Sequence, residues 1–172
     1  MTKKILIAYY SRRGENYCNG EIRDLKIGNT ELIAKKIASL ITANLFKIDT
    51  VKKYPISYME TTEVAKKELQ ENARPALTES VKNMQEYDTI ILGYPSWWGT
   101  MPMAVFTFLE QYDFSDKTII PFCTNEGSGL GSSIRDLKQL CPKANILAGV
   151  SIHGSKAQQA DSQAQQIADM TM

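Results

Sequence analysis

Short apolar segments alternate along this chain with longer segments whose apolar residues recur at helical spacing, and this alternation limits the fold more than any other feature. The apolar segments cover residues 5–10, 45–48, 89–94, 118–123 and 146–152. The first, third and fourth are nearly continuous in apolar or β-favouring residues, which is typical of parallel strands covered on both faces. The second alternates between polar and apolar residues and predicts a half-exposed edge strand.

The segments between and after these strands carry the pattern of amphipathic helices. The predicted helices cover residues 30–40, 61 or 62 to 75, 102–110, 132–140 and 157–170. In the first of them, Ile33 and Ile37 fall on one stripe while charged residues face outward. Thr61 or Thr62 is the candidate N-cap of the second helix.

Strands that alternate with helices predict an α/β fold with right-handed crossovers and helices on both faces of a parallel sheet. Five such strands favour a three-layer, doubly wound sandwich with a five-stranded parallel sheet of order 2-1-3-4-5. The chain has 172 residues and shows no repeat or linker, so we expect a single domain over residues 1–172. In this order the loops after strands 1, 3 and 4 meet at one crevice.

Charge and cysteine content disfavour several classes of function. The formal net charge is +1, and basic and acidic residues are mixed along the chain, which argues against a nucleic-acid partner. Cys18, Cys123 and Cys141 form no CxxC pair and lack metal-ligand spacing, so we expect free thiols in a reducing compartment. No stretch is long enough to span a bilayer. We therefore expect a cytoplasmic protein without a membrane partner.

The first loop of the predicted crevice follows the first strand and resumes, after an insertion, at the start of the first helix. Its candidate binding residues are Ser11, Arg12, Arg13, Gly28, Asn29 and Thr30. Free N–H groups at a helix N-terminus, a glycine and nearby hydroxyls form a phosphate cradle. An ordinary turn capped by Asn29 or Thr30 explains the same residues. The loop is neither a Walker motif nor GxGxxG, which disfavours nucleoside triphosphates and dinucleotides.

The second and third loops follow the third and fourth predicted strands. Their candidate binding residues are Pro95, Ser96, Trp97, Trp98 and Gly99, then Thr124, Asn125, Glu126, Gly127, Ser128 and Gly129. Adjacent side chains on an extended segment point to opposite sides, so Trp97 and Trp98 are not both expected in the core. An aromatic ring at a crevice suits stacking on a flat ligand. Each loop could be a simple turn, but three on adjacent strands favour one shared site.

The order of these motifs resembles the flavodoxin family, in particular its small bacterial flavodoxin-like branch. The resemblance rests on Tyr10-Ser11, Gly28-Asn29-Thr30, Pro95 to Gly99 and Thr124 to Gly129. It implies FMN as cofactor, with Ser11, Asn29 and Thr30 on the phosphate. It also implies that residues 95–99 lie along one face of the isoalloxazine ring and that residues 124–129 surround its edge and the ribityl chain.

The chain departs from the family pattern in two places. Residues 15–27 interrupt the phosphate loop, as a lid or a surface excursion, and leave the roles of Arg12, Arg13 and Asn16 open. The third loop lacks the aromatic residue with which flavodoxins that shuttle single electrons commonly sandwich the ring, and the chain is not strongly acidic. These departures favour an NAD(P)H-dependent oxidoreductase acting on quinone-like or other small acceptors. The alternative is a flavodoxin electron carrier, reduced by a partner reductase and passing electrons to partner redox proteins.

Neither function requires a catalytic side chain or a metal, because the cofactor carries the chemistry. His153, the only histidine, follows the fifth predicted strand, where a surface or capping role is more common than acid–base catalysis. A fold that has lost its cofactor is disfavoured because all three loops retain ligand-suited residues. The sequence leaves open the electron donor, the acceptor and the oligomeric state.

Overall fold

The computed structural model describes residues 2–172; Met1, part of the predicted domain, lies outside the described residues. The strands are β1 (Ile5–Tyr9), β2 (Gly14–Cys18), β3 (Glu21–Leu25), β4 (Asn44–Lys47), β5 (Thr89–Pro95), β6 (Thr118–Asn125), β7 (Asn145–Ile146) and β8 (Val150–His153). The α-helices are α1 (Asn29–Ala38), α2 (Tyr58–Gln70), α3 (Met103–Glu110), α4 (Ser133–Leu140) and α5 (Asp161–Asp169). Two 3₁₀ helices are described, η1 (Met84–Glu86) and η2 (Gly154–Gln159).

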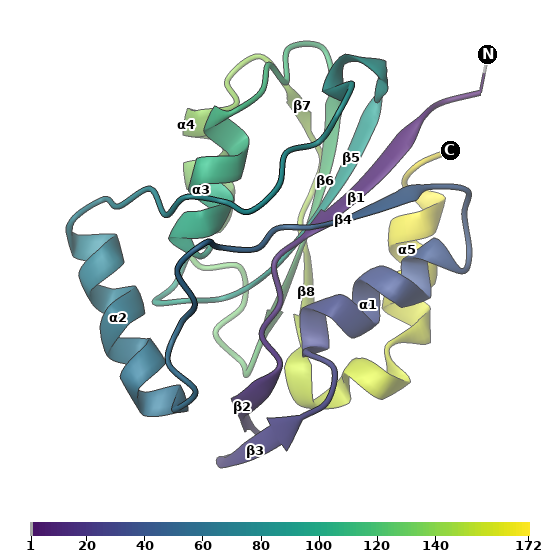
Figure 1. Ribbon diagram of the computed structural model, residues 1–172. Helices are drawn as coiled ribbons and strands as arrows, with labels where there is room; N and C mark the ends of the chain where they lie inside the picture. Colours follow the sequence, from purple (N-terminus) through teal and green to yellow (C-terminus); the bar gives the residue numbers. More distant parts are fainter. Residues whose placement is uncertain (1) are drawn as a thin grey trace.

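The large sheet confirms the predicted doubly wound fold. Its strand order is β4-β1-β5-β6, and both β7 and β8 pair with β6 at the far edge. All of these pairings are parallel. Helices α1 and α5 cover one face, and α3 and α4 cover the other (Figure 1). Taking β7 and β8 as one interrupted strand, this is the order 2-1-3-4-5.

The sheet separates two apolar cores because successive side chains of each strand point to opposite faces. In β1, Leu6 and Ala8 contribute to the core shared with α3 and α4. Ile7 contributes to the other core, which also contains Ile33 and Ile37 of α1. Every residue of β1 is buried, so its near-continuous apolar sequence reflects cover on both faces.

The fifth predicted strand, residues 146–152, is interrupted by a one-residue bulge. Ile146 pairs with Ile119 of β6, and Val150 pairs with Phe122. The edge strand therefore advances four residues where β6 advances three, which leaves one extra residue in the edge strand. Gly149 lies in this interruption, and a Cβ there would come within 2.9 Å of the Ile134 side chain of α4. The bulge therefore lets the edge strand pass closely beneath α4.

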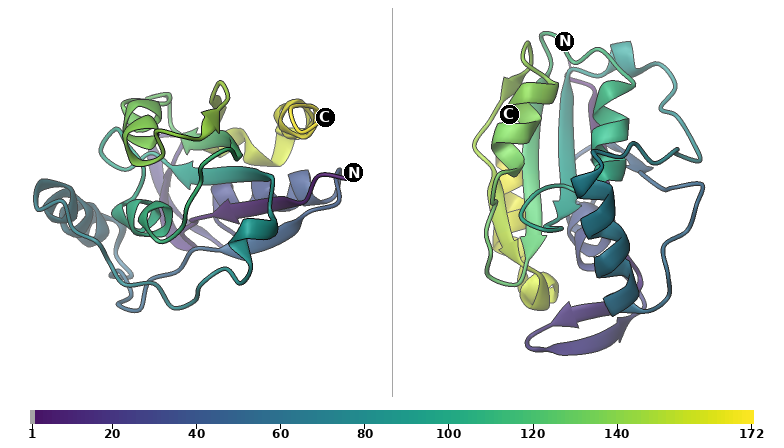
Figure 2. Two further views of the ribbon diagram at one scale, coloured as in Figure 1. Left: turned by 90° about the horizontal axis from the view of Figure 1, so that it is seen from above. Right: turned by 90° about the vertical axis from the view of Figure 1, so that its left-hand side faces the viewer.

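Helix α2 begins earlier than the sequence predicts. Ser57 is its N-cap, and the Ser57 hydroxyl accepts a hydrogen bond from the Glu60 backbone N–H at 3.3 Å. Thr61 and Thr62, the predicted caps, lie inside the helix and donate their hydroxyls to backbone carbonyls of the preceding turn. Only Thr61 and Ala65 of this helix are buried. Accordingly, α2 stands away from the sheet, as both Figure 1 and Figure 2 show.

The last predicted helix, residues 157–170, is also divided. Its first turn belongs to η2, and α5 follows after Ala160. Gly154 opens η2 at a point of close approach, where a Cβ would lie 2.7 Å from the Asn29 side-chain nitrogen. This contact brings η2 beside the N-terminus of α1.

Candidate functional site

A pocket of about 480 Å³ lies at the carboxyl ends of β1, β5 and β6, where a doubly wound sheet usually binds its ligand. Residues from all three predicted loops line it. They are Ser11, Arg12, Asn29 and Thr30 from the first loop, Pro95, Ser96, Trp97 and Trp98 from the second, and Thr124, Asn125, Glu126 and Ser128 from the third. Arg13, Gly28, Gly99, Gly127 and Gly129, also predicted for the site, do not line the pocket.

Direct hydrogen bonds join the three loops. The hydroxyls of Thr30 and Thr124 lie 2.7 Å apart and are buried, which ties the start of α1 to the third loop. The Ser96 backbone N–H donates to the Thr124 carbonyl at 2.9 Å. The Ser128 hydroxyl lies 3.4 Å from that of Ser96. The convergence predicted from strand order is therefore present as a connected polar network.

The N-terminus of α1 supplies the polar end of the pocket. The Ser11 hydroxyl accepts a hydrogen bond from the Glu31 N–H at 3.1 Å, so its own proton is free to point into the pocket. Within residues 2–172, the backbone N–H groups of Asn29 and Thr30 have no acceptor. Gly28 contributes by its size, because a Cβ there would lie 2.2 Å from the Ser11 hydroxyl oxygen. Free donors at a helix N-terminus favour an anion.

The two arginines of the first loop have different surroundings. Arg13 binds Glu31 through two hydrogen bonds, at 3.1 and 2.8 Å, which turns it away from the pocket. Arg12 lines the pocket and donates to the carbonyl oxygens of Glu15, Pro55 and Ile56. Among the described residues, no carboxylate pairs with Arg12, so its charge is compensated only by backbone dipoles.

The tryptophan loop is a tight turn in which the two rings occupy different environments. Trp98 and Gly99 both have positive φ, 56° and 82°, and Trp97 pairs with Thr100 across the turn, as in a type I′ hairpin turn. The Trp97 ring packs edge-on against Tyr10 and Tyr54, each with centroids 5.2 Å away. Trp98 is half exposed.

Trp98 is nevertheless fixed in place, because its indole N–H donates to the Thr62 carbonyl of α2 at 2.9 Å. Lys66 of the same helix lies over the ring, 5.4 Å from its centroid. Trp97 packs against aromatic rings and Trp98 is half exposed, so the two side chains are not both in the core, and both residues line the pocket.

The glycines of the third loop shape the loop rather than line the pocket. The side-chain oxygen of Asn125 accepts hydrogen bonds from the N–H groups of Gly127 and Gly129, each at 3.0 Å. Both glycines have positive φ, 115° and 71°, a conformation that side chains disfavour. Their N–H groups are therefore used within the loop, and Asn125 organises it.

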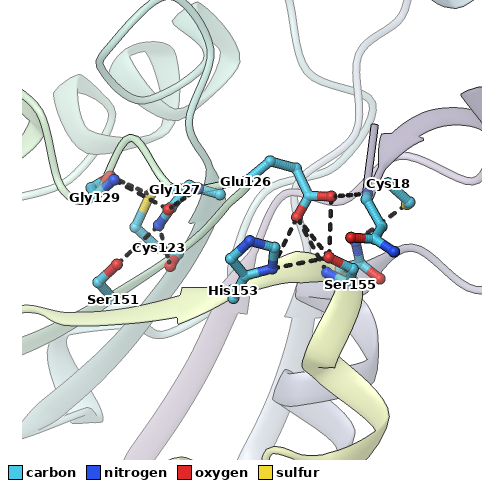
Figure 3. Close-up of polar contacts among 11 residues, drawn as sticks. Cys18, Cys123, Glu126, Gly127, Gly129, Ser151, His153 and Ser155 are labelled. Atoms are coloured by element: carbon cyan, nitrogen blue, oxygen red, sulfur yellow. Dashed lines mark hydrogen bonds and ion pairs between the residues drawn. The ribbon is translucent and has the colours of Figure 1, made fainter. Parts of the chain in front are cut away.

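Glu126 connects the third loop to the turn of the β2–β3 hairpin and to the residues at the end of β8 (Figure 3). Its carboxylate accepts from the Asn19 N–H at 2.6 Å and from the Ser155 N–H at 3.1 Å. His153 Nδ1 lies 3.2 Å from the carboxylate and 2.8 Å from the Ser155 hydroxyl. In a hydrolytic triad the serine and the carboxylate contact opposite ring nitrogens, whereas here both contact Nδ1. This cluster is therefore a structural connection, and His153 does not line the pocket.

The remaining lining residues come from three elements that sequence reasoning did not assign to the site. They are Asn16 and Tyr17 of β2, Tyr58, Met59, Thr61, Thr62, Glu63 and Ala65 of α2, and Gly154 of η2. The insertion of residues 15–27 is thus mostly an ordered hairpin, with Asn19 and Gly20 forming its turn. The Ser57–Glu60 capping box was a sequence signal for the start of α2. No sequence pattern indicated that α2 would lie over the pocket.

Several other predictions concern the chemistry of the chain. Cys18, Cys123 and Cys141 are free thiols, as expected, and burial raises the pKa of Cys123 to about 12. Within residues 2–172, no group of three or more His, Cys, Asp or Glu side chains could hold a metal ion. In the same residues, every helix is too short or too polar to cross a bilayer.

The chain is similar in sequence and in fold to known proteins. A family model described as Flavodoxin matches residues 24–166. A candidate flavoprotein from Bacteroides uniformis is 27% identical, with 96% of this chain and 99% of that chain covered and a TM-score of 0.74. A second, from Bacteroides eggerthii, is 25% identical, with 95% and 99% covered and a TM-score of 0.72.

A third solved structure, a flavoprotein from Lactobacillus acidophilus in complex with FMN, shares the fold. It is 23% identical, with 92% of this chain and 98% of that chain covered and a TM-score of 0.68. The comparison with curated proteins returned no match.

Proposed function

The chain belongs to the flavodoxin family, and from this premise we propose that it is a cytoplasmic flavoprotein that binds FMN and uses it for redox chemistry. The observation that carries the proposal is the pocket at the carboxyl ends of β1, β5 and β6. One end offers hydroxyl and backbone N–H donors, and the other offers aromatic rings. FMN has the matching halves, a phosphate and a flat ring system.

The donor set at the polar end fits a phosphate. The Ser11 hydroxyl proton and the N–H groups of Asn29 and Thr30 are free, and the Arg12 guanidinium adds a positive charge without a carboxylate partner. Charge-assisted hydrogen bonds of this kind are the stronger ones in proteins. The Thr30 hydroxyl is already bonded to Thr124, so we assign its backbone rather than its side chain to the phosphate.

The aromatic end fits a flat ring. Tyr10 and Tyr54 hold Trp97 edge-on, and α2 holds Trp98 from outside, so neither indole needs to reorganise when a ring system packs against it. When bound, FMN supplies the transfer of one or two electrons. The protein orients it and excludes water from one side.

We further propose that the protein is an NAD(P)H-dependent oxidoreductase that reduces small, quinone-like acceptors. The observation that favours this activity is the apolar wall formed by Tyr17, Tyr58 and Met59, which belongs to the same pocket but lies on elements outside the three cofactor loops. A wall of this kind offers a small flat molecule a place beside the cofactor.

The second candidate is an electron carrier that docks on partner redox proteins. Exposed apolar side chains near the pocket favour it, since Ile56 is 87% exposed, Met59 is 59% exposed and Trp98 is 50% exposed. A surface of this composition is typical of a protein interface.

Anaerobic stopped-flow absorbance of the FMN-loaded protein separates the two functions. For an oxidoreductase we expect NADH or NADPH to bleach the flavin in one two-electron stage and a quinone to restore its colour. For a carrier we expect slow reduction by either nucleotide, two one-electron stages on titration with dithionite, and rapid reduction only through a partner reductase. The second pattern would contradict the oxidoreductase proposal.

A further inference from the structure

Two tyrosines from different elements form a stacked pair in the wall of the pocket. Tyr17 of β2 and Tyr58 of α2 have ring centroids 6.1 Å apart and planes inclined by 25°. Both line the pocket, and Tyr17 remains 45% exposed. The Tyr58 backbone N–H donates to the Glu15 carboxylate at 2.9 Å, which fixes the base of its side chain. The pair therefore presents aromatic surface to whatever enters the pocket.

The hairpin that carries Tyr17 is fixed at both ends. At its base, the Glu15 carboxylate accepts from the Tyr58 backbone N–H at 2.9 Å, and Arg12 bridges the Glu15 and Ile56 carbonyls. At its tip, the Asn19 N–H donates to Glu126 at 2.6 Å. The hairpin thus lies between the start of α2 and the third loop, as its place at the end of the sheet in Figure 1 and Figure 2 indicates. Preorganised aromatic surface binds a ligand at a low entropic cost.

The charges around the pair favour a neutral ligand. The charge of Arg12 is assigned above to the phosphate, and Glu126 is held by Asn19 and Ser155, so neither charge is left for a further ligand. Glu63 also lines the pocket, and no cation pairs with it among the described residues. Its charge opposes an anionic ligand. Met59 adds a half-exposed thioether, which contacts aromatic rings favourably.

We propose that the Tyr17–Tyr58 pair is the recognition surface for the electron acceptor, and that this acceptor is a flat, uncharged quinone. This inference rests on the proposed function and assigns its acceptor site to the inserted hairpin and α2. In the net reaction, reduced nicotinamide is the electron donor and supplies two electrons and one proton. A second proton comes from solvent, and the quinone is reduced to the hydroquinone.

The test measures equilibrium binding of menadione to the oxidised, FMN-loaded protein by calorimetry. We expect Tyr17→Leu to raise the Kd for menadione by about three- to tenfold, because leucine fills space but cannot stack. Tyr17→Phe keeps the ring and should stay within about twofold of the unmodified protein. Ile22→Ala is the matched control, since Ile22 pairs with Tyr17 across the hairpin, is exposed and does not line the pocket. It should leave the Kd unchanged.

Two further measurements separate this inference from the function on which it rests. The Kd for FMN should be the same in Tyr17→Leu and in the unmodified protein, and a parallel loss of FMN affinity would overturn the inference by assigning Tyr17 to the cofactor. An unchanged menadione Kd in Tyr17→Leu would overturn it as well. If menadione binding depends on Tyr17 but neither nucleotide reduces the flavin, the quinone site stands and the oxidoreductase proposal fails.

Discussion

Glu31 shows how a buried carboxylate is accommodated beside a site that is expected to hold a phosphate. Its side chain is 3% exposed, and both Arg13 and Lys35 bind its carboxylate, at 2.8 and 3.0 Å. The hydrogen bonds from Arg13 are the main reason that its pKa is held at about 2, below the ordinary value of 4.5. The pair of cations neutralises a charge that would otherwise repel an anion. Arg13 thus supports the site indirectly, through Glu31, and does not itself line the pocket.

This depressed pKa gives the stability of the fold a defined pH dependence. A carboxylate with a lowered folded-state pKa stabilises the protein above its unfolded pKa, and the stabilisation is lost as the pH falls from about 4.5 to about 2. We expect Glu31→Gln to lower the free energy of unfolding at pH 7 by about 1–2 kcal/mol, since Arg13 is partly exposed and screened by solvent. Urea denaturation across this pH range should show the difference vanishing near pH 2. A difference that is constant with pH would contradict this account.

At the scale of elements, α2 and the β2–β3 hairpin differ from the rest of the fold. Helix α1 buries Ile33, Ala34 and Ile37, whereas α2 buries only Thr61 and Ala65. The helix is held mainly by polar contacts to Glu15 and Trp98, and Arg12 holds the segment just before it. Few buried apolar contacts mean a low free energy of local opening.

We therefore expect amide hydrogens of α2 to exchange faster than those of α1 in the protein without cofactor. Adding menadione to the FMN-loaded protein should slow exchange in the hairpin and in the first half of α2, because these segments form the wall of the pocket to which the quinone is assigned. Helix α5, which does not line the pocket, is the internal control and should be unaffected. Hydrogen exchange read by mass spectrometry measures all three segments at once. Equal protection of α2 and α5 would argue against this placement of the ligand.

The same contrast explains which elements could be predicted from the sequence. Strands β1, β5 and β6 are covered on both faces, so their apolar runs identify them directly. The start of α2 was misplaced because Thr61 and Thr62 are good capping residues, yet the local Ser57 cap and a tertiary contact to Glu15 set the boundary. The two strands of the β2–β3 hairpin bury only Cys18, so no apolar period reveals them.

For the whole molecule, the order of the strands in the sheet brings motifs that are distant in sequence together at one site. The loops after β1, β5 and β6 were predicted to converge because these strands are neighbours in a doubly wound sheet. The hydrogen bond between Thr30 and Thr124 joins residues distant in sequence, and it could be anticipated only as proximity. The contributions of Tyr17 and Tyr58 to the pocket could not be predicted from the sequence, because they depend on how an insertion folds back across the pocket.

Because a ligand at this junction contacts loops from across the sheet, its binding should stabilise the fold as a whole. FMN at about 100 times its Kd should add about 2.7 kcal/mol to the free energy of unfolding, which corresponds to a rise in Tm of roughly 5–10 °C for a domain of this size. Ser11→Ala removes one hydrogen bond to the phosphate, at a cost of about 1.5–3 kcal/mol in affinity. At the same FMN concentration its shift should fall to about half or less.

Riboflavin distinguishes a contact to the phosphate from a contribution to the fold, because it has the ring and ribityl chain but no phosphate. Ser11 also accepts the Glu31 N–H at 3.1 Å, so the Ser11→Ala protein without ligand is expected to melt somewhat earlier. The shift caused by riboflavin should nevertheless be the same in both proteins, while the shift caused by FMN is reduced only in the variant. Differential scanning calorimetry with each ligand measures this. Equal losses with FMN and riboflavin would assign Ser11 to the fold and remove it from the phosphate site.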